Sequence, residues 1–267
     1  MGRRDEVEKL VHAQLEGTEI RYGVVPFSFQ DLLPVDRYNK PYNGKSLFSG
    51  KGIVIVGENA IDNLKLEGDT CYISTSAYST LTDSRVAEAM VSQLAERFAD
   101  TALIVDLYAG VGGDTVAFAK VFKRVHAHET NPKKLRFLAH NIKAHGLEER
   151  VNVFGNSFDS SSLDGFPLSE TIFYLDPEWR GRHLEVADFY PHQMYPDPTE
   201  TMSGIGKLGG ERFILKSPRN FSLGPSSLPH IELQVELYGE CNVKYIFFGS
   251  SDFLQNVSSL NRKIKLD

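Results

Sequence analysis

The feature that most constrains the fold is a buried strand, a glycine-rich turn and a helix in direct succession at residues 102–121, ALIVDLYAGVGGDTVAFAKV. A short apolar run bounded by turn signals predicts a strand that is covered on both faces. Strand-like and helix-like segments then alternate: RVHAHE, NPKKLRFLAHNIKAHG, RVNVFGN, TIFYLDP and ERFILKSP. This order predicts a mostly parallel sheet with helices on both faces. The adjacent segments HIELQVELYG and VKYIFFGS predict an antiparallel edge.

The first 80 residues differ in character from the regular region that follows. They are rich in aromatic residues, Pro, Asn and Gly, with one short amphipathic segment at Glu6 to Glu16. The regular pattern starts near Thr82, where DSRVAEAMVSQLAERFA has helical spacing and Thr82 or Asp83 as its N-cap. We therefore predict an N-terminal extension over residues 1–80, on the substrate side of an α/β domain over residues 81–267.

Composition excludes several classes of protein. No apolar run approaches the roughly 20 residues that span a membrane, and the formal net charge of -6 argues against a protein that coats long nucleic acid. The chain has two cysteines, Cys71 and Cys241, without the spacing of a disulfide framework or a zinc site. We expect a monomeric protein of a reducing compartment, the nucleus or the cytoplasm, with no metal ion.

The glycine-rich turn has the composition of a nucleoside-cofactor site. Asp106 ends the strand, and Gly110, Gly112 and Gly113 precede the helix, so a ligand can approach the backbone closely. Glu129 ends the next strand, where an acid can bind both hydroxyls of a ribose.

The spacing of the glycines separates two cofactors. A dinucleotide site needs a third glycine at the position that Thr115 occupies, so that a pyrophosphate can lie on the helix N-terminus. An acid at the strand end instead favours the ammonium and sulfonium groups of S-adenosylmethionine. The sequence therefore predicts S-adenosylmethionine as the cofactor.

A second unusual stretch follows the fourth strand of the domain. Asp176, Pro177, Glu178 and Trp179 lie at the sheet edge where doubly wound folds place their reactive site, and Trp179 is the only tryptophan. A carboxylate or carbonyl there can orient an exocyclic amine, the proline stiffens the backbone, and the indole ring can stack on a base. If that base is a cationic 7-methylguanine, cation–π attraction adds to the stacking. The structural alternative is a tryptophan that only packs against the core.

Together these motifs resemble the trimethylguanosine synthase family of RNA cap guanine-N2 methyltransferases. DLYAGVGGDTVAFA, STLTDSRVAEAM, LDPEW, LKSPRN and KYIFFG match that family's segments in order over residues 79–250. The resemblance implies a Rossmann-like class I methyltransferase with a seven-stranded sheet, which methylates N2 of 7-methylguanosine caps. It implies 7-methylguanosine-capped RNA as the partner.

The resemblance also assigns roles to residues by matching position. The cofactor-binding set is Thr82, Asp106, Ala109, Gly110, Gly112, Gly113, Asp114 and Glu129, with Asn156, Ser157 and Phe158 at the adenine. The catalytic set is Asp176, Pro177, Glu178 and Trp179, and the cap-binding set is Trp179, Arg219 and Asn220.

The chain departs from the family pattern most clearly at Glu178, which replaces a proline of the catalytic motif. The carboxylate of Glu178 could accept N1–H and N2–H of guanine, or the change could weaken catalysis. Two alternatives therefore stay open: a methyltransferase acting on guanine N2 or adenine N6 of rRNA or tRNA, and a catalytically weak cap-binding module.

Overall fold

The computed structural model describes residues 53–56, 65–99, 102–163, 165–179, 187–223, 229–237 and 240–266. The helical segment expected at residues 6–16 and most of the predicted N-terminal extension lie outside this part of the chain.

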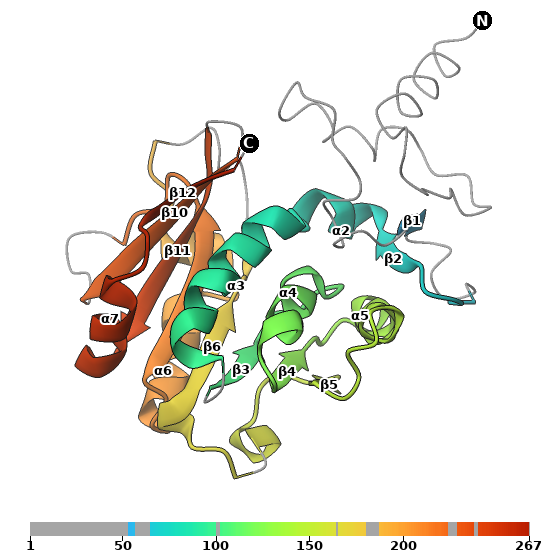
Figure 1. The fold of residues 1–267 in the computed structure, drawn as a ribbon, viewed down its shortest axis with the longest axis horizontal. Coiled ribbons are helices and arrows are strands. Elements are labelled where there is room, and N and C mark those ends of the chain that lie inside the picture. The colour runs from blue at the N-terminus through green and yellow to red at the C-terminus, as the bar shows by residue number, and fades with distance from the viewer. Residues whose placement is uncertain are drawn as a thin grey trace, which may run out of the picture.

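An eight-stranded sheet forms the centre of the fold, in the order β12-β10-β11-β9-β6-β3-β4-β5 (Figure 1). All strands run parallel except β11, which is antiparallel to both of its neighbours. The bounds are β3 Leu103–Asp106, β4 Val125–His128, β5 Val151–Phe154, β6 Thr171–Leu175, β9 Arg212–Pro218, β10 His230–Leu237, β11 Glu240–Gly249 and β12 Lys263–Leu266. The mostly parallel, Rossmann-like sheet and its antiparallel hairpin are confirmed. The structure corrects the number of strands from seven to eight, because β12 adds a strand beyond β10.

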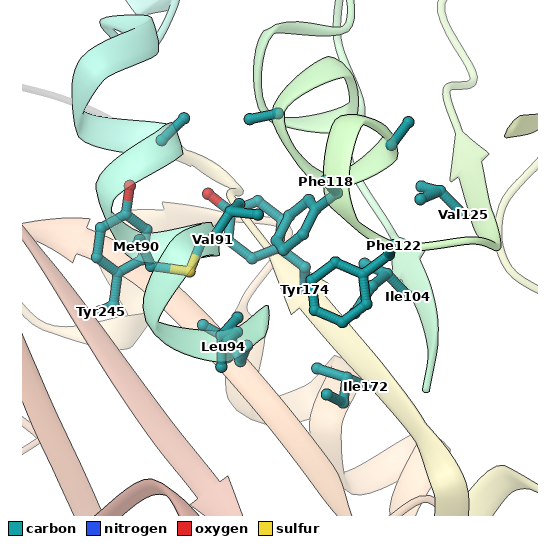
Figure 2. Close-up of a cluster of buried hydrophobic side chains, with 14 of the residues drawn as sticks. Met90, Val91, Leu94, Ile104, Phe118, Phe122, Val125, Ile172, Tyr174 and Tyr245 are labelled. Atoms are coloured by element: carbon teal, nitrogen blue, oxygen red, sulfur yellow. The ribbon is translucent and has the colours of Figure 1, made fainter. Parts of the chain in front are cut away.

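Helices cover both faces of the sheet, and successive residues of β3 show this. Ile104 packs in a core that includes residues of α3 (Ser84–Phe98), α4 (Gly113–Val121), α5 (Pro132–Ala144) and α7 (Ser251–Ser258). Leu103 and Val105 belong to a second core, which contains Ile205 of α6 (Pro198–Lys207). Figure 2 shows the first core, where Met90 and Leu94 of α3 and Phe118 of α4 lie over strand residues such as Tyr174. None of the helices in the described residues is both long and apolar enough to cross a membrane.

The ends of the helices follow their local sequence. Asp83 caps α3 and accepts a hydrogen bond from the Arg85 backbone N–H, whereas Thr82, the other expected cap, bonds elsewhere. Pro132 occupies the first turn of α5, and Gly146 follows this helix with a positive φ of 66°. Both residues are typical of these positions, proline in the first turn of a helix and glycine just after its end.

The described part of the N-terminal region packs on α5. Strands β1 (Ile53–Val56) and β2 (Cys71–Ser74) form a separate parallel pair, followed by α2 (Thr75–Thr80). Asn141 of α5 is fully buried, and its side-chain amide bonds the backbone N–H and C=O of Tyr72 and the C=O of Val111. One amide group therefore joins β2 to the glycine-rich turn after β3.

Candidate active site

The glycine-rich turn needs its glycines for two separate reasons. Gly112 has a φ of 99°, in the left-handed region that residues with a Cβ rarely adopt. Gly113 begins α4, and a Cβ there would lie 2.6 Å from Cδ1 of Leu81. The turn is thus held close to the segment before α3, at the carboxyl edge of the sheet.

Asp106, at the end of β3, is a deeply buried acid. Its Oδ2 accepts a hydrogen bond of 2.6 Å from Oγ1 of Thr115, and its Oδ1 is buried without a hydrogen-bond partner among the described residues. Burial raises the pKa of the Asp106 carboxyl to about 8, and the Thr115 hydrogen bond offsets only part of that rise.

Buried Asp114 and half-buried Asp176 form a second group around buried Lys216, a residue that no sequence motif marks as part of the site. The Lys216 ammonium lies 2.5 Å from Oδ2 of Asp176 and 3.3 Å from Oδ2 of Asp114, and it also bonds Oγ1 of Thr82. Thr82 in turn donates a 2.8 Å hydrogen bond to Oδ2 of Asp114. The structure therefore brings Thr82, Asp114 and Asp176 into one network.

The network shifts the pKa values of its members. Burial raises the pKa of Asp176 to about 6, although the charge of Lys216 opposes that rise. Burial alone would lower the pKa of Lys216, but the carboxylates of Asp114 and Asp176 more than reverse this, so its pKa lies above the ordinary value. Lys216 therefore carries its charge throughout the physiological range.

The acids outnumber the buried cation, and this imbalance is the main electrostatic property of the site. Two buried carboxyls, Asp106 and Asp114, and the half-buried carboxyl of Asp176 stand against one buried ammonium in the described residues, that of Lys216. Oδ1 of Asp114, like that of Asp106, is buried and has no hydrogen-bond partner within the described part of the chain. A ligand that brings positive charge and N–H donors would fit both observations. S-adenosylmethionine, with its ammonium and sulfonium groups, has that chemistry.

Glu129 lies at the end of β4, next to the glycine-rich turn. Burial raises its pKa, and the hydrogen bond from the Asn131 backbone N–H, 2.7 Å from Oε1, works in the opposite direction. The backbone of Ala109 bonds that of His128, so the turn and the end of β4 are joined directly. This places the predicted ribose acid at the same edge of the sheet as the buried acids.

The predicted adenine segment follows β5 at that edge. Asn156 and Ser157 are exposed, and the backbone oxygen of Asn156 lies 3.1 Å from Nδ1 of buried His128. Phe158 is half-buried and meets the rings of His128 and Phe173 edge-on. His128 thus contacts this segment through the backbone oxygen of Asn156 and the ring of Phe158.

The DPEW segment, residues 176–179, follows the end of β6, and its side chains differ in exposure. Pro177 is buried, whereas Glu178 is exposed and forms an ion pair of 3.2 Å with Lys134 in the first turn of α5. Trp179 is half-buried and packs against the core on the α6 side. Glu178 and Trp179 form β7 (Glu178–Trp179), which pairs with β8 (Met194–Tyr195).

Arg219 and Asn220 form a turn after β9. Arg219 is exposed, and the backbone oxygen of Asn220 accepts a hydrogen bond from the Phe189 N–H at 2.9 Å. Because β9 lies beside β6, this turn follows the same end of the sheet as the DPEW segment.

Within the described residues, no group of three or more His, Cys, Asp or Glu side chains is arranged to hold a metal ion.

Comparison with known proteins gives matches to RNA methyltransferases. The chain is 21% identical over 187 residues to trimethylguanosine synthase of Saccharomyces cerevisiae, covering 68% of this chain and 59% of that protein. It is 26% identical over 113 residues to the Schizosaccharomyces pombe protein of the same name (41% and 46% covered). It is also 35% identical over 71 residues to tRNA (guanine(37)-N(1))-methyltransferase 2 of Arabidopsis thaliana (27% and 10% covered). The chain thus spans less than two thirds of the length of each of these relatives.

Among solved structures, a methyltransferase from Geobacter sulfurreducens aligns with a TM-score of 0.42 and 11% identity, covering 66% of this chain and 84% of that chain. The family model described as RNA cap guanine-N2 methyltransferase matches residues 101–247. That interval is more than half of the 267 residues and contains every predicted site residue except Thr82. This protein therefore belongs to the RNA cap guanine-N2 methyltransferase family.

Proposed function

We propose that this protein transfers a methyl group from S-adenosylmethionine to the exocyclic N2 of 7-methylguanosine at the end of capped RNA. The observation that carries the proposal is the position of Asp176. Its carboxyl lies at the end of β6, is linked through Lys216 to Asp114 in the first turn of α4, and is followed directly by Pro177, Glu178 and Trp179.

The cofactor supplies the methyl group when it is bound. Asp106 and Asp114 each have a buried oxygen without a hydrogen-bond partner among the described residues, which would accept its cationic end, and Glu129 would bind the ribose hydroxyls. Asn156, Ser157 and Phe158 would lie at the adenine. The excess of buried acid over base supports a cationic cofactor over a dinucleotide, whose phosphates are anionic.

Asp176 is the group that would orient the substrate amine. Its Oδ2 is held by Lys216, and its side chain keeps 20% of its exposure, so Oδ1 can accept an N–H bond from N2 of guanine. As the bond from N2 to the methyl carbon forms, the bond from that carbon to the sulfonium sulfur would break, and the N2 proton would pass to solvent water; the positive charge of 7-methylguanine makes that proton easier to lose. The task of Asp176 is therefore to hold the amine in position, a contribution that positioning can make large.

Glu178 can still take part in guanine recognition. The Glu178 side chain is 64% accessible and that of its ion-pair partner Lys134 is 26% accessible, so water screens the pair, and surface pairs contribute only about 0–1 kcal/mol. Breaking the pair to accept N1–H of guanine would therefore cost little.

The test is methyl transfer to 7-methyl-GTP, with GTP as the control and mass spectrometry to count the methyl groups. Binding is followed separately through the fluorescence of Trp179, the single tryptophan. We expect transfer to 7-methyl-GTP and quenching by 7-methyl-GTP but not by GTP, and loss of transfer in Asp176→Asn. Binding without transfer would support the cap-binding module instead.

A second candidate is a guanine methyltransferase that acts on tRNA or rRNA. The similarity to tRNA (guanine(37)-N(1))-methyltransferases favours it. Transfer to an unmethylated tRNA transcript, with none to 7-methyl-GTP, would establish this candidate and reject the cap.

A further inference from the structure

In the described part of the chain, Lys216 is the one buried cation among the acids of the site, and its contacts come from three separate segments. They are Asp176 after β6, Asp114 in the first turn of α4, and Thr82 in the segment that leads into α3. An ammonium has three N–H donors, and here each of them has an acceptor. The side chain is only 3% exposed, so water does not compete for these bonds.

We propose that Lys216 is a positioning residue that sets the substrate-facing carboxylate of Asp176 relative to the cofactor loop. The inference rests on the proposed function, because it takes Asp176 as the acceptor of the substrate amine. Lys216 itself touches neither the substrate nor the cofactor in this assignment.

The register of the sheet explains how a lysine can do this. Leu175, the last residue of β6, pairs with Leu215 of β9. Asp176 is therefore the first residue after β6, and Lys216 is the next residue of β9. Lys216 lies within a seven-residue strand that also pairs with β11, where Tyr245 is its partner. The ammonium is therefore fixed by the sheet, whereas Asp176 belongs to a segment that has already left it.

The contact defines which oxygen of Asp176 faces the substrate. With Oδ2 bonded to Lys216, the carboxylate cannot rotate freely, and Oδ1 is left for the amine. The positive charge also favours the ionised carboxylate, which accepts N–H bonds, over the acid, which would present an O–H to them. A shift of the carboxylate by about 1 Å is enough to lower the rate of a positioned reaction on the order of 10²-fold.

If Lys216 served only to stabilise the fold, its variants would behave differently from those of a positioning residue. Replacing a buried pair by apolar groups is often neutral for stability, while removing one partner leaves a buried charge and destabilises the fold. Three proteins separate these effects: Lys216→Arg, which keeps the charge and moves its position, Lys216→Met, and the double variant Lys216→Met with Asp114→Asn, which restores the charge balance. Lys120→Met, which breaks the ion pair of Lys120 with Glu88 on the outer side of α4, is the matched control.

Each variant is measured for unfolding temperature, for the dissociation constant of S-adenosylhomocysteine, and for kcat and KM with 7-methyl-GTP. We expect Lys216→Arg to fold, to bind S-adenosylhomocysteine within a few-fold of the wild type, and to lose kcat by about 10²-fold with little change in KM for 7-methyl-GTP. The double variant should recover unfolding temperature, and Lys120→Met should keep the wild-type unfolding temperature and kcat.

Wild-type kcat in Lys216→Arg, or recovery of kcat in the double variant, would overturn the assignment. If the wild type does not methylate 7-methyl-GTP, the proposed function fails, and the same comparison on unmethylated tRNA decides the role of Lys216. If the wild type transfers methyl groups to neither substrate, both proposals are rejected.

Discussion

Replacing Asp106 by asparagine should stabilise the protein and weaken its cofactor site at the same time. The pKa of Asp106 rises from 3.8 to about 8 on folding, so its contribution to stability is fully present below pH 3.8 and is lost as the pH rises through 8. At pH 7 the unfolded chain gains on the order of 4 kcal/mol by ionising this group, from about 3 pH units at ~1.36 kcal/mol each. Asparagine keeps the shape and the Thr115 bond but removes the charge. The asparagine N–H₂ group would take the place of Oδ1, where it finds no acceptor, and this unmade hydrogen bond reduces the gain in stability by about 1–3 kcal/mol.

The free energy of unfolding of Asp106→Asn should therefore exceed that of the wild type by about 2 kcal/mol at pH 7, which raises the unfolding temperature by roughly 4–8 °C for a chain of this size. Thermal unfolding of the wild type and of Asp106→Asn between pH 4 and pH 8 measures it, with the exposed Asp188→Asn as a control. The difference should shrink towards pH 4, where the unfolded wild type is itself half protonated. Calorimetry with S-adenosylhomocysteine should show at least tenfold weaker binding in Asp106→Asn, because an ammonium bound at Asp106 would lower its pKa and ionise it, and asparagine cannot form that charge-assisted bond. A variant that is less stable at pH 7, or a difference independent of pH, would refute the reasoning.

Three further predictions concern the elements around the site. Gly113→Ala should lower the free energy of unfolding by about 1–3 kcal/mol because the new methyl group overlaps Leu81. Gly204→Ala in α6, where nothing lies within 4 Å, should raise it by roughly 0.5–1 kcal/mol. Chemical denaturation measures both variants, and equal effects would contradict the packing argument. Asn141→Ala should lower the free energy of unfolding by about 2–4 kcal/mol and weaken binding of S-adenosylhomocysteine, because three buried backbone groups lose their hydrogen-bond partner. Unchanged binding would mean that β2 does not support the glycine-rich turn. Lys134→Ala should change stability by less than about 1 kcal/mol, and its effect on KM for 7-methyl-GTP shows whether pairing competes with guanine recognition by Glu178.

Sequence patterns predicted the local parts of this structure well. The strand, glycine-rich turn and helix at residues 102–121 carry their signals within a few residues of one another, and so do Pro132 and Gly146 at the ends of α5. The position of Asp106, Glu129 and Asp176 at one edge of the sheet was predictable because parallel strands in a doubly wound sheet bring their carboxyl ends together there.

The parts that were missed depend on contacts between distant residues. Lys216 sits in an apolar strand, and its partners are 40, 102 and 134 residues away, so no local pattern marks it as buried or paired. Asn141 reads as an ordinary polar residue of an amphipathic helix, yet it is buried against β2, 69 residues away. The strand β12 was missed because KIKL is short and alternates with lysine, which suits an edge strand and an exposed tail equally well.

That last strand has a consequence for how the molecule behaves at high concentration. Without it, residues 234–237 of β10 would present unpaired backbone groups, and an open row of this kind is a template for joining another chain. With it, the outermost strand carries Lys263 and Lys265 at exposed alternate positions, and Lys263 is paired with Glu236. Two copies that approached edge to edge would bring like charges together before any backbone bond could form. The four residues of β12 thus oppose edge-to-edge association, and removing them should increase the tendency of the protein to dimerise or precipitate.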